Sequence, residues 1–583
     1  MLKQNEFDVL YFIKKNGLVS YRKIAKGCDV SLGTVSNVID SLRSSDLIDE
    51  QGISKAGLNA LEPYKVDNAI IMAAGLSSRF VPLSLECPKG LLKVKGEVLI
   101  ERQIEQLHEA GIKDIVIVLG YKKEAFFYLE SKYGVKILIN SEFNTKNNTE
   151  TLYLVREYLA NTYICSSDDY FATNVFEQYV YNSYYASIHV KAKTDEWYMA
   201  SGPHHEIKKV NKYGDEGDIM LGHVYWNREF SGSFIKLLEE HHSLGDYDQL
   251  LWEQLFADNI KKLPPMLVKT YPDNVIFEFD SLEELRAFDE HYVNDVESSI
   301  MKNICGALNC EEKDITGFKA IKEGLTNTSF VFEVKGVKYV YRHPGDGTEE
   351  IIDRAHEKKA LELAKSIGVD PTFLCMDAKE GWKISYYVPN IRIPDYKNFD
   401  DSKRVIAVLR SLHEKNYSVS WEFKPWEESL KLEDLVRKAG PIQMEDFDEL
   451  KANVGRLYKK TVGDGVNSRF CHCDTYGPNW MISGDKTILI DWEYAGNSDP
   501  GCDVGGYIMD AMYDVKESEA FIKEYCGASF NDTLRFHYLA YVAIISYYWF
   551  VWALYRESCG AVMGESLHNW YTMAKRYSDY LTR

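Results

Sequence analysis

The sequence predicts a chain of several domains that combines α/β with α+β architecture. The chain has 583 residues, whereas single domains usually hold roughly 100 to 200 residues. From about residue 69, short strands alternate with helical segments, which is typical of a mainly parallel sheet covered by helices. From about residue 300, antiparallel strands with tight turns precede a long, mostly helical stretch.

The composition is typical of a soluble globular protein and favours the cytoplasm. Hydrophobic residues make up 45% of the chain and charged residues 27%. We expect no membrane span and no signal peptide, because no uninterrupted apolar run approaches ~20 residues. Eleven scattered cysteines without a C-x-x-C pair indicate reduced thiols. The net charge of −20 excludes a general affinity for nucleic acid or anionic membranes, so binding of that kind would be local.

Residues 1 to 64 are predicted to form short helices followed by a turn and a small wing. Apolar residues recur at three- and four-residue spacing, and Ser20 and Ser31 stand where helix caps belong. This pattern resembles the winged helix-turn-helix domains of bacterial regulators, with residues 31–45 as the recognition helix. The resemblance implies DNA as a partner. Because basic and acidic residues nearly balance, phosphate attraction would be modest, and self-association is an equal alternative.

The second segment, residues 65 to 297, opens with a phosphate-binding pattern. A strand runs into small residues that let the backbone approach a ligand and present N–H groups to phosphate; these are Ala73, Ala74 and Gly75. Arg79 and Lys89 add positive charge for a triphosphate and its departing pyrophosphate. The G-x-S-x-R element followed by P-K-G-L resembles the sugar-nucleotide and phosphocholine nucleotidyltransferases, which share a Rossmann-like fold.

That resemblance also implies a magnesium site. The family places one Mg²⁺-binding carboxylate at the end of a central strand and another near the end of the domain. Asp168, with Asp169 beside it, and Asp280 occupy these positions, and Mg²⁺ favours oxygen ligands. A turn or helix cap is the competing interpretation of Asp168. No enzyme nucleophile is needed, since the acceptor attacks the α-phosphorus while the metal and Lys89 stabilise the leaving charge.

Several further segments, among them "TDEWYMASG" and "GHVYWNREFSG", resemble the phosphocholine cytidylyltransferase branch more than the sugar branch. The resemblance implies CTP and phosphocholine as substrates, and it implies that Asn148 contacts the nucleotide. Trp197, Trp226 and Trp252 are candidates for an aromatic wall around a cation. A core position is the competing interpretation of each tryptophan.

The third segment, residues 298 to 583, contains the spacing of a kinase catalytic loop. His472-x-Asp474 is followed by Asn479, and Asp491 comes after a short hairpin. In such a loop Asp474 would accept the proton of a substrate hydroxyl. Asn479 and Asp491 would hold Mg²⁺ against the phosphates of ATP.

The strands upstream of this loop supply the other parts of a nucleotide site. "EGLTNTSF", which includes Thr326 and Asn327, would form the turn that covers the phosphates. Arg342 would be the cationic partner of the nucleotide, and Glu357 on a following helix would orient it. A small β-rich lobe ahead of a larger α-rich lobe is a protein-kinase-like architecture.

These motifs resemble the choline kinases and their relatives, the aminoglycoside phosphotransferases. Choline kinases carry a W-x-x-W pair on a helix after the catalytic core, and Trp549 and Trp552 match it. Residues three apart share a helix face, so both rings can hold a trimethylammonium group, which donates no hydrogen bond. Asp510 stands where the family has a glutamate facing the ammonium. The nearby Tyr541, Tyr548 and Tyr555 are predicted to be core residues.

Together the resemblances predict a bifunctional enzyme of CDP-choline synthesis. ATP would phosphorylate choline to phosphocholine, and CTP would then convert phosphocholine to CDP-choline and pyrophosphate, with Mg²⁺ at both sites. One alternative keeps the chemistry but changes the substrate to ethanolamine or another amino alcohol. A second alternative is a choline-responsive DNA-binding regulator with vestigial enzyme domains.

Overall fold

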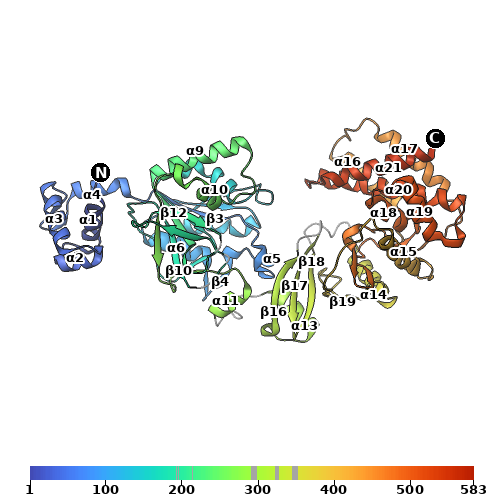
Figure 1. Cartoon of the computed structure of the whole chain (residues 1–583), viewed down its shortest axis with the longest axis horizontal. Helices are drawn as coiled ribbons and strands as arrows, with labels where there is room; N and C mark the ends of the chain where they lie inside the picture. Colours follow the sequence, from blue (N-terminus) through green and yellow to red (C-terminus); the bar gives the residue numbers. More distant parts are fainter. Residues whose placement is uncertain are drawn as a thin grey trace. The chain divides into compact units, whose positions relative to one another are not determined.

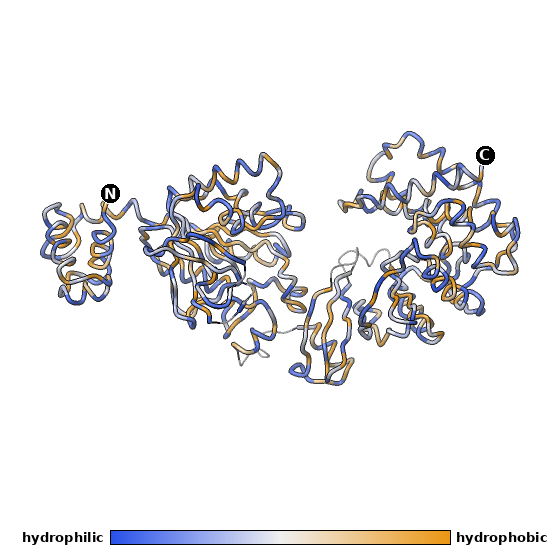
Figure 2. The backbone as a smooth tube through the Cα atoms, viewed as in Figure 1, coloured by the Kyte–Doolittle hydropathy of each residue, from blue (hydrophilic) through white to orange (hydrophobic). Residues whose placement is uncertain are grey.

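The computed structural model describes residues 1–191, 193–194, 196–212, 214–289, 298–321, 327–344 and 352–582, without the side chains of Ser78 and Asn327. The chain forms two compact units, Met1–Gly306 (unit 1) and Ala307–Arg583 (unit 2). Figure 1 shows the elements of each unit, and Figure 2 shows apolar residues concentrated within them. The division of the chain into domains at residues 64 and 297 stays a prediction.

A small helical module opens unit 1. It consists of α1 (Gln4–Asn16), α2 (Tyr21–Cys28), α3 (Leu32–Ser44), the antiparallel pair β1 (Ile48–Asp49) and β2 (Gly52–Ile53), and α4 (Lys55–Leu61). The expected cap at Ser31 is present, because its side chain accepts a hydrogen bond of 3.0 Å from the Thr34 N–H at the start of α3. Apolar residues from α1 and α3 meet in a shared core, which includes Leu10, Ile13, Val35 and Ile39.

The helical module is docked on the rest of unit 1 through α1. Tyr179, from the segment that follows the central strands, is buried in the core of the module itself. The Tyr11 hydroxyl donates to Glu177 at 2.7 Å, and Lys15 forms an ion pair of 2.7 Å with the same carboxylate. Tyr64 stacks on Tyr181 with ring centroids 5.1 Å apart. The module therefore shares a core with the domain that follows it.

A nine-stranded sheet forms the centre of unit 1. Its parallel part has the order β8-β3-β6-β7, with β3 (Asn68–Ala73), β6 (Ile115–Leu119), β7 (Lys136–Ile139) and β8 (Thr162–Ser166). Its second part joins β8 through an antiparallel pairing with β13 and contains β10 (Tyr184–Val190), β11 (Tyr198–Ser201), β12 (Ile207–Asn211), β13 (Gly217–Trp226) and β14 (Leu267–Tyr271). The short strands β9 (Asp169–Phe171) and β15 (Ile276–Glu278) pair with each other beside it.

Helices cover both faces of this sheet because alternate residues of the strands point to opposite sides. On one face, Ile71 and Ile117 pack against α6 (Leu99–Glu109). On the other, Ile70 and Val116 belong to a core with the helices α8 (Asn148–Leu154), α9 (Arg228–Leu244) and α10 (Trp252–Asn259). Figure 1 shows α9 and α10 along one side of the sheet. The loops at the carboxyl ends of β3 and β8 are thereby held between two packed layers.

Unit 2 begins with a small lobe built on an antiparallel sheet of order β16-β17-β18-β20-β19. Its strands are β16 (Ile315–Ile321), β17 (Asn327–Val334), β18 (Val337–Pro344), β19 (Phe373–Met376) and β20 (Lys383–Tyr386). The helix α14 (Arg354–Ser366) begins at a cap formed by Asp353, whose side chain accepts from two backbone N–H groups. This lobe supplies one wall of the cavity described below.

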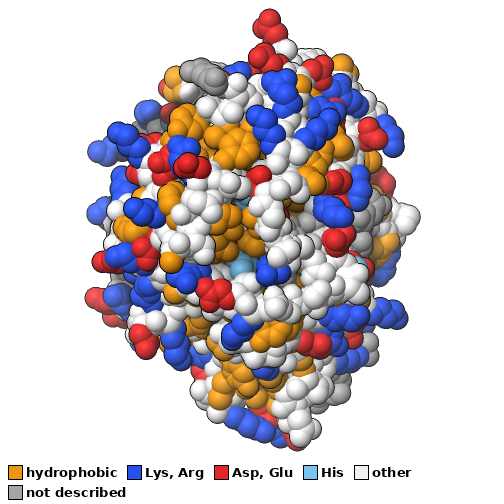
Figure 3. All heavy atoms as spheres, turned by 90° about the vertical axis from the view of Figure 1, so that its right-hand side faces the viewer, with side chains coloured by type: hydrophobic (Ala, Val, Ile, Leu, Met, Phe, Trp, Pro, Cys, Tyr) orange, Lys and Arg blue, Asp and Glu red, His pale blue; other side chains and the backbone are white. Residues whose placement is uncertain are grey.

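The larger lobe is mostly helical. Its helices are α15 (Phe399–His413), α16 (Pro425–Ala439), α17 (Phe447–Thr461), α18 (Gly501–Asp510), α19 (Val515–Cys526), α20 (Asp532–Ser558) and α21 (Glu565–Thr582). Short antiparallel pairs, β21 (Arg469–Cys471) with β24 (Gly496–Ser498) and β22 (Trp480–Ser483) with β23 (Lys486–Leu489), lie between α17 and α18. Figure 3 shows one face of the molecule, where basic, acidic and apolar side chains are interspersed.

The helix α20 is long and apolar enough to cross a membrane by length and composition, which the sequence pattern did not lead us to expect. Within unit 2, however, 89% of its most apolar window is buried. Tyr541 and Tyr548 are core residues, as predicted, and Tyr555 is half-buried. All eleven cysteines are free. We conclude that α20 is the central core helix of this lobe.

Two candidate active sites

The site in unit 1 is centred on a buried ion pair between Lys89 and Asp168. The Lys89 Nζ atom lies 2.6 Å from the Asp168 Oδ2 atom, and the lysine side chain is only 7% exposed. Asp168 follows β8, and Ser166 donates a hydrogen bond to its carboxylate. Burial raises the pKa of Asp168, but the charge of Lys89 outweighs this effect and holds that pKa below its ordinary value.

The predicted phosphate-binding turn and the P-K-G-L motif lie close to this pair. Ala73 ends β3, which is parallel to and paired with β8, and Ala74 and Gly75 follow it directly. Gly90 must be a glycine because a Cβ atom there would lie 2.8 Å from the Ser167 hydroxyl oxygen. This close approach places Lys89 against the turn that holds Asp168.

Asp280, the second predicted metal ligand, belongs to the same group of charges. It accepts a hydrogen bond of 2.9 Å from Arg79, whose side chain is largely exposed. Burial lowers the pKa of Lys89, but the negative charges of Asp168, Glu278 and Asp280 outweigh it and raise that pKa. Lys89 therefore faces three carboxylates from distant parts of the chain.

Two further carboxyl groups lie beside Asp168, the buried Asp169 and the half-buried Glu278, and the sequence indicated no separate role for either. Glu278 ends β15 opposite Asp169 in β9. Burial, together with the charge of Asp168, raises the pKa of Glu278 to about 8. Among the described residues, neither oxygen of the Asp169 carboxyl has a hydrogen-bond partner, and burial and the charge of Glu278 raise its pKa strongly. Oxygen donors left unsatisfied beside a buried lysine suit a divalent cation such as Mg²⁺.

The predicted aromatic wall of unit 1 is wrong for two of its three tryptophans. Trp252 is 1% exposed and stacks on Tyr185, with ring centroids 5.7 Å apart, while Trp226 packs edge-on against it at 5.4 Å. Both are core residues because neighbouring rings cover their faces. Trp197 is half-buried at the edge of the same cluster.

Asn148, predicted to contact the nucleotide, connects two helices instead. Its side-chain oxygen accepts a hydrogen bond of 2.8 Å from the backbone N–H of Trp252, and its Nδ2 atom donates to the Glu253 carboxylate at 3.2 Å. The amide thus holds the first residues of α10 against the start of α8. Both ends of the amide are engaged in this contact, which gives Asn148 a structural role.

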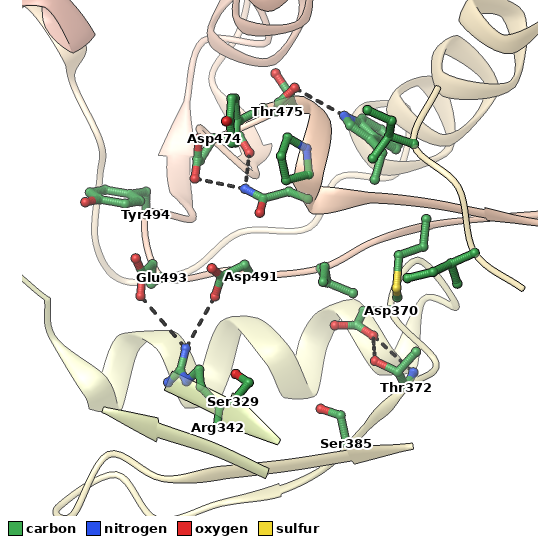
Figure 4. Close-up of a pocket in the computed structure, with 18 of the residues that line it drawn as sticks. Ser329, Arg342, Asp370, Thr372, Ser385, Asp474, Thr475, Asp491, Glu493 and Tyr494 are labelled. Carbon is green, nitrogen blue, oxygen red and sulfur yellow. Dashed lines mark hydrogen bonds and ion pairs between the residues drawn. The ribbon is translucent and has the colours of Figure 1, made fainter. Parts of the chain in front are cut away.

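The site in unit 2 is a cavity of about 500 Å³ between the small lobe and the helical lobe. The predicted catalytic residues Asp474, Asn479 and Asp491 line it together with Arg342 from β18. Figure 4 shows Arg342 reaching from the small lobe toward Asp491 and Glu493, with Asp474 on the other side of the cavity. The fold therefore gathers residues that are separated by about 150 positions in the sequence.

A network of buried charges forms the small-lobe wall of this cavity. The Nη1 atom of Arg342 lies 2.6 Å from the Oε1 atom of Glu357 and 3.3 Å from the Oδ1 atom of Asp491. Lys383, which pairs with Arg342 across the sheet, lies 3.7 Å from the same Asp491 oxygen. Burial raises the pKa of Glu357, but Arg342 and Lys383 outweigh it and hold that pKa at about 2. Two cations and an acidic group thus stand where the phosphates of a nucleotide and a metal ion would meet.

Hydrogen bonds from Asn479 and to Asp503 hold the loop that carries Asp474. Asn479 donates from Nδ2 to the Asp474 carboxylate at 2.9 Å, which leaves its carbonyl oxygen available. The buried Asp503 of α18 accepts from the backbone N–H groups of His472 at 2.9 Å and Cys473 at 2.6 Å. Cys473 has a φ of 67° and Asp491 one of 68°, left-handed conformations that are uncommon in non-glycine residues and cluster at functional sites. Burial and the charges of Asp491 and Glu493 raise the pKa of Asp474 strongly.

Aromatic rings close the end of the cavity beside Asp474. Trp549 and Trp552 of α20 line it, as do Tyr494 and Trp570. Trp549 lies 5.3 Å from Tyr494, 5.4 Å from Trp552 and 5.8 Å from Trp570, measured between ring centroids. The W-x-x-W pair is thus half of a box of four rings.

One predicted residue of unit 2, Asp510, lies outside this arrangement. Asp510 is absent from the described residues that line the cavity, because its carboxylate accepts from the Gly477 N–H at 2.8 Å and from the Tyr396 hydroxyl. The Asp510 carboxylate is therefore engaged within the protein, and its contact with an ammonium group stays a prediction. Thr326 lies outside the described residues, and so does the side chain of Asn327.

Sequence patterns missed several residues of both sites. The residues that were not predicted are Glu278, Glu493, Lys383, Tyr494 and Trp570. The only available signal was proximity: Glu278 lies two residues before Asp280, and Glu493 and Tyr494 lie two and three residues after Asp491. Nothing in the sequence connects Lys383 or Trp570 with the catalytic loop, because the fold alone brings them there.

Two protein families match separate parts of the chain. Residues 68–209 match the Nucleotidyl transferase family, and residues 318–544 match the Choline/ethanolamine kinase family. These matches confirm the Rossmann-like and protein-kinase-like folds that the sequence predicted.

Three relatives illustrate the similarity. The chain is 36% identical to the choline-phosphate cytidylyltransferase of Streptococcus pneumoniae over 39% of its own length and 99% of that protein. It is 32% identical to the 2-aminoethylphosphonate cytidylyltransferase of Lancefieldella rimae, over 39% of this chain and 93% of that protein. The chain is also similar to the solved structure of choline kinase LicA from S. pneumoniae. The match covers 48% of this chain and 98% of the LicA chain, with 24% identity and a TM-score of 0.43. The chain thus belongs to the choline-phosphate cytidylyltransferase family, and it joins that domain to one that matches the Choline/ethanolamine kinase family.

Proposed function

We propose that this chain makes CDP-choline from choline in two successive steps, one in each unit. The observation that supports this most directly is the cavity of unit 2, which combines the loop of Asp474, the charges around Arg342 and a box of aromatic rings. A kinase cleft alone would not need the rings. A substrate that carries a hydroxyl group and a permanent cation requires both.

In the first step the rings hold the trimethylammonium end of choline. That group donates no hydrogen bonds, so its attraction is to ring faces, each contributing on the order of 0.5 to 2 kcal/mol. The hydroxyl end then lies toward Asp474, which accepts its proton. The raised pKa of Asp474 makes it a stronger base than an exposed aspartate.

Arg342 and Lys383 bind the phosphates of ATP in the same cavity. Asp491 and the free carbonyl oxygen of Asn479 offer the oxygen donors that fit Mg²⁺, and Glu357 fixes the orientation of Arg342. When bound, Mg²⁺ neutralises the negative charge that develops on the phosphates. Asn479 meanwhile holds the Asp474 carboxylate toward the hydroxyl.

In the second step unit 1 joins phosphocholine to CTP. The backbone of Ala73, Ala74 and Gly75, with Lys89 and Arg79, binds the triphosphate, and a phosphocholine oxygen attacks the α-phosphorus in line while pyrophosphate leaves. Asp168 and Asp280 are the residues that would hold Mg²⁺, since both are oxygen donors in the charge group around Lys89. We assign the enzyme to the cytoplasm, because all of its cysteines are free thiols.

Two substitutions separate the steps. Asp474→Asn removes the base of the kinase and is expected to lower choline phosphorylation by more than about 100-fold, while cytidylyl transfer from supplied phosphocholine persists. Asp168→Asn is expected to produce the opposite pattern. Both activities are measured on each purified variant, by ADP release and by pyrophosphate release. Loss of both activities in a folded variant would contradict two independent sites.

Ethanolamine is the competing substrate, and the ring box tests it. Trp570→Ala removes a ring that contacts both Trp549 and Trp552, so the KM for choline is expected to rise about tenfold, as the loss of one cation–π contact of about 1.4 kcal/mol predicts. The KM for ATP is expected to change little. If ethanolamine were the better substrate of the wild-type enzyme, or if the variant kept its KM for choline, the assignment of the rings would be wrong.

For the amino-terminal module we propose a winged helix that contacts DNA or a second copy of the chain. The helices α1 to α3 and the β1–β2 hairpin support it, and α1 and the segment after α4 contribute to the docking of the module. Residues 1–64 contain eight basic and eight acidic residues, so they carry none of the excess negative charge of the chain. Arg22, Lys23 and Lys26 are exposed on α2.

A band-shift assay on DNA from upstream of the gene tests this role. We expect a retarded complex at low salt that weakens as salt rises, because phosphate contacts release counterions. Reversing the charge of Arg22 and Lys26 should abolish the complex. If no complex forms and light scattering shows a dimer that the truncated chain lacks, self-association is the function of the module.

A further inference from the structure

We infer that Gln103 is a positioning residue for the metal-binding turn of the cytidylyltransferase site. This inference rests on the role proposed above for Asp168. Gln103 lies on α6, and its side chain is buried. No sequence motif pointed to this helix. The task of Gln103 is to hold the chain on both sides of Asp168.

The geometry of its amide group carries the argument. The Gln103 Nε2 atom donates to the carbonyl oxygen of Ser166 at 2.8 Å and to that of Asp169, also at 2.8 Å. Ser166 is the last residue of β8 and Asp169 the first of β9. The two protons of one amide group thus span the turn of Ser167 and Asp168, and they fix the distance between its two ends.

The other atom of the amide supports this orientation of the group. Gln103 Oε1 is buried and, within the described part of the chain, has no hydrogen-bond partner. A buried acceptor without a partner costs stability. A flipped amide would place this oxygen against two carbonyl oxygens, so the observed orientation is the one that holds the turn.

Neighbouring residues of α6 hold the same segment farther from Asp168. Gln106 donates from Nε2 to the carbonyl oxygen of Phe171 at 3.0 Å, and Arg102 donates to Phe171 and Ala172 at 2.9 and 3.0 Å. Gln106 is also a buried glutamine whose Oε1 atom lacks a partner among the described residues. Gln106 is therefore a matched control, because its amide donates to Phe171 and not to the two ends of the turn that holds Asp168.

The test compares Gln103→Met with Gln106→Met, since methionine preserves the volume and removes the donors. For Gln103→Met we expect cytidylyl transfer from supplied phosphocholine to fall about 10- to 100-fold, and the Mg²⁺ concentration for half-maximal rate to rise, as is usual when a group that orients a metal ligand is lost. For Gln106→Met we expect both quantities to stay within about threefold of wild type. Choline phosphorylation by the same samples serves as an internal control.

A second measurement does not depend on turnover. Water-proton relaxation reports Mn²⁺–CTP bound to unit 1 in chains that carry Asp491→Asn, with Asp168→Asn as the reference without a site. Gln103→Met should weaken this binding and Gln106→Met should not. If Gln103→Met unfolds, Gln103→Asn, whose shorter amide cannot span both carbonyls, should show the same loss.

Each outcome decides between the hypotheses. Wild-type binding in Gln103→Met, or equal losses in both glutamine variants, would overturn the inference while leaving the proposed function intact. A wild-type chain without cytidylyl transfer would instead contradict the proposed function, and the Mn²⁺ measurement would still decide the role of Gln103.

Discussion

In each unit, the site depends on a cation buried among carboxylates. Lys89 faces Asp168 in unit 1, and Arg342 faces Glu357 in unit 2. A buried charge without a partner is very costly, and removing one member of such a pair typically costs about 3 to 5 kcal/mol. The backbone of each site is also held in place, in unit 1 by the close approach of Gly90 to Ser167 and in unit 2 by the hydrogen bonds that Asp503 accepts from the loop before Asp474.

The same constraint makes both sites suitable for phosphate chemistry. A cation that already has a carboxylate partner still attracts a polyanionic nucleotide, and a carboxylate that already has a cation partner can exchange it for a metal ion. Glu278 and Glu493, whose pKa values are raised by burial and by neighbouring acids to about 8 and about 7, are the acidic excess in these two groups. A divalent cation would relieve that excess.

Local motifs predicted the parts of the sites that lie close together in the chain. The spacing of Asp474, Asn479 and Asp491 was sufficient because one loop and one hairpin carry all three. Trp549 and Trp552 were predicted for a similar reason, since one helix presents both rings to one side. The sequence could not predict partners from distant segments. Trp570 lies on α21, and Lys383 reaches the site because it pairs with Arg342 across the sheet. No local pattern encodes such contacts.

Burial was the other property that the sequence could not supply. Trp252 and Trp549 were both candidates for holding a cation, yet rings cover the first in a core and the second lines a cavity. Asp510 is a second example, because its carboxylate accepts hydrogen bonds from Gly477 and Tyr396 that no local pattern indicated. The docking of Tyr179 into the amino-terminal module also depends on three-dimensional packing that no linear pattern indicates.

The central claim is that one polypeptide converts choline to CDP-choline at two sites. Phosphorus NMR of the purified chain with choline, ATP, CTP and Mg²⁺, followed over time, tests it most directly. The account predicts that the phosphocholine signal rises first and then falls, while the diphosphate signals of CDP-choline and the signal of pyrophosphate grow at equal rates. Phosphocholine that accumulates without CDP-choline, or ATP that is not consumed in the presence of choline, would contradict the account.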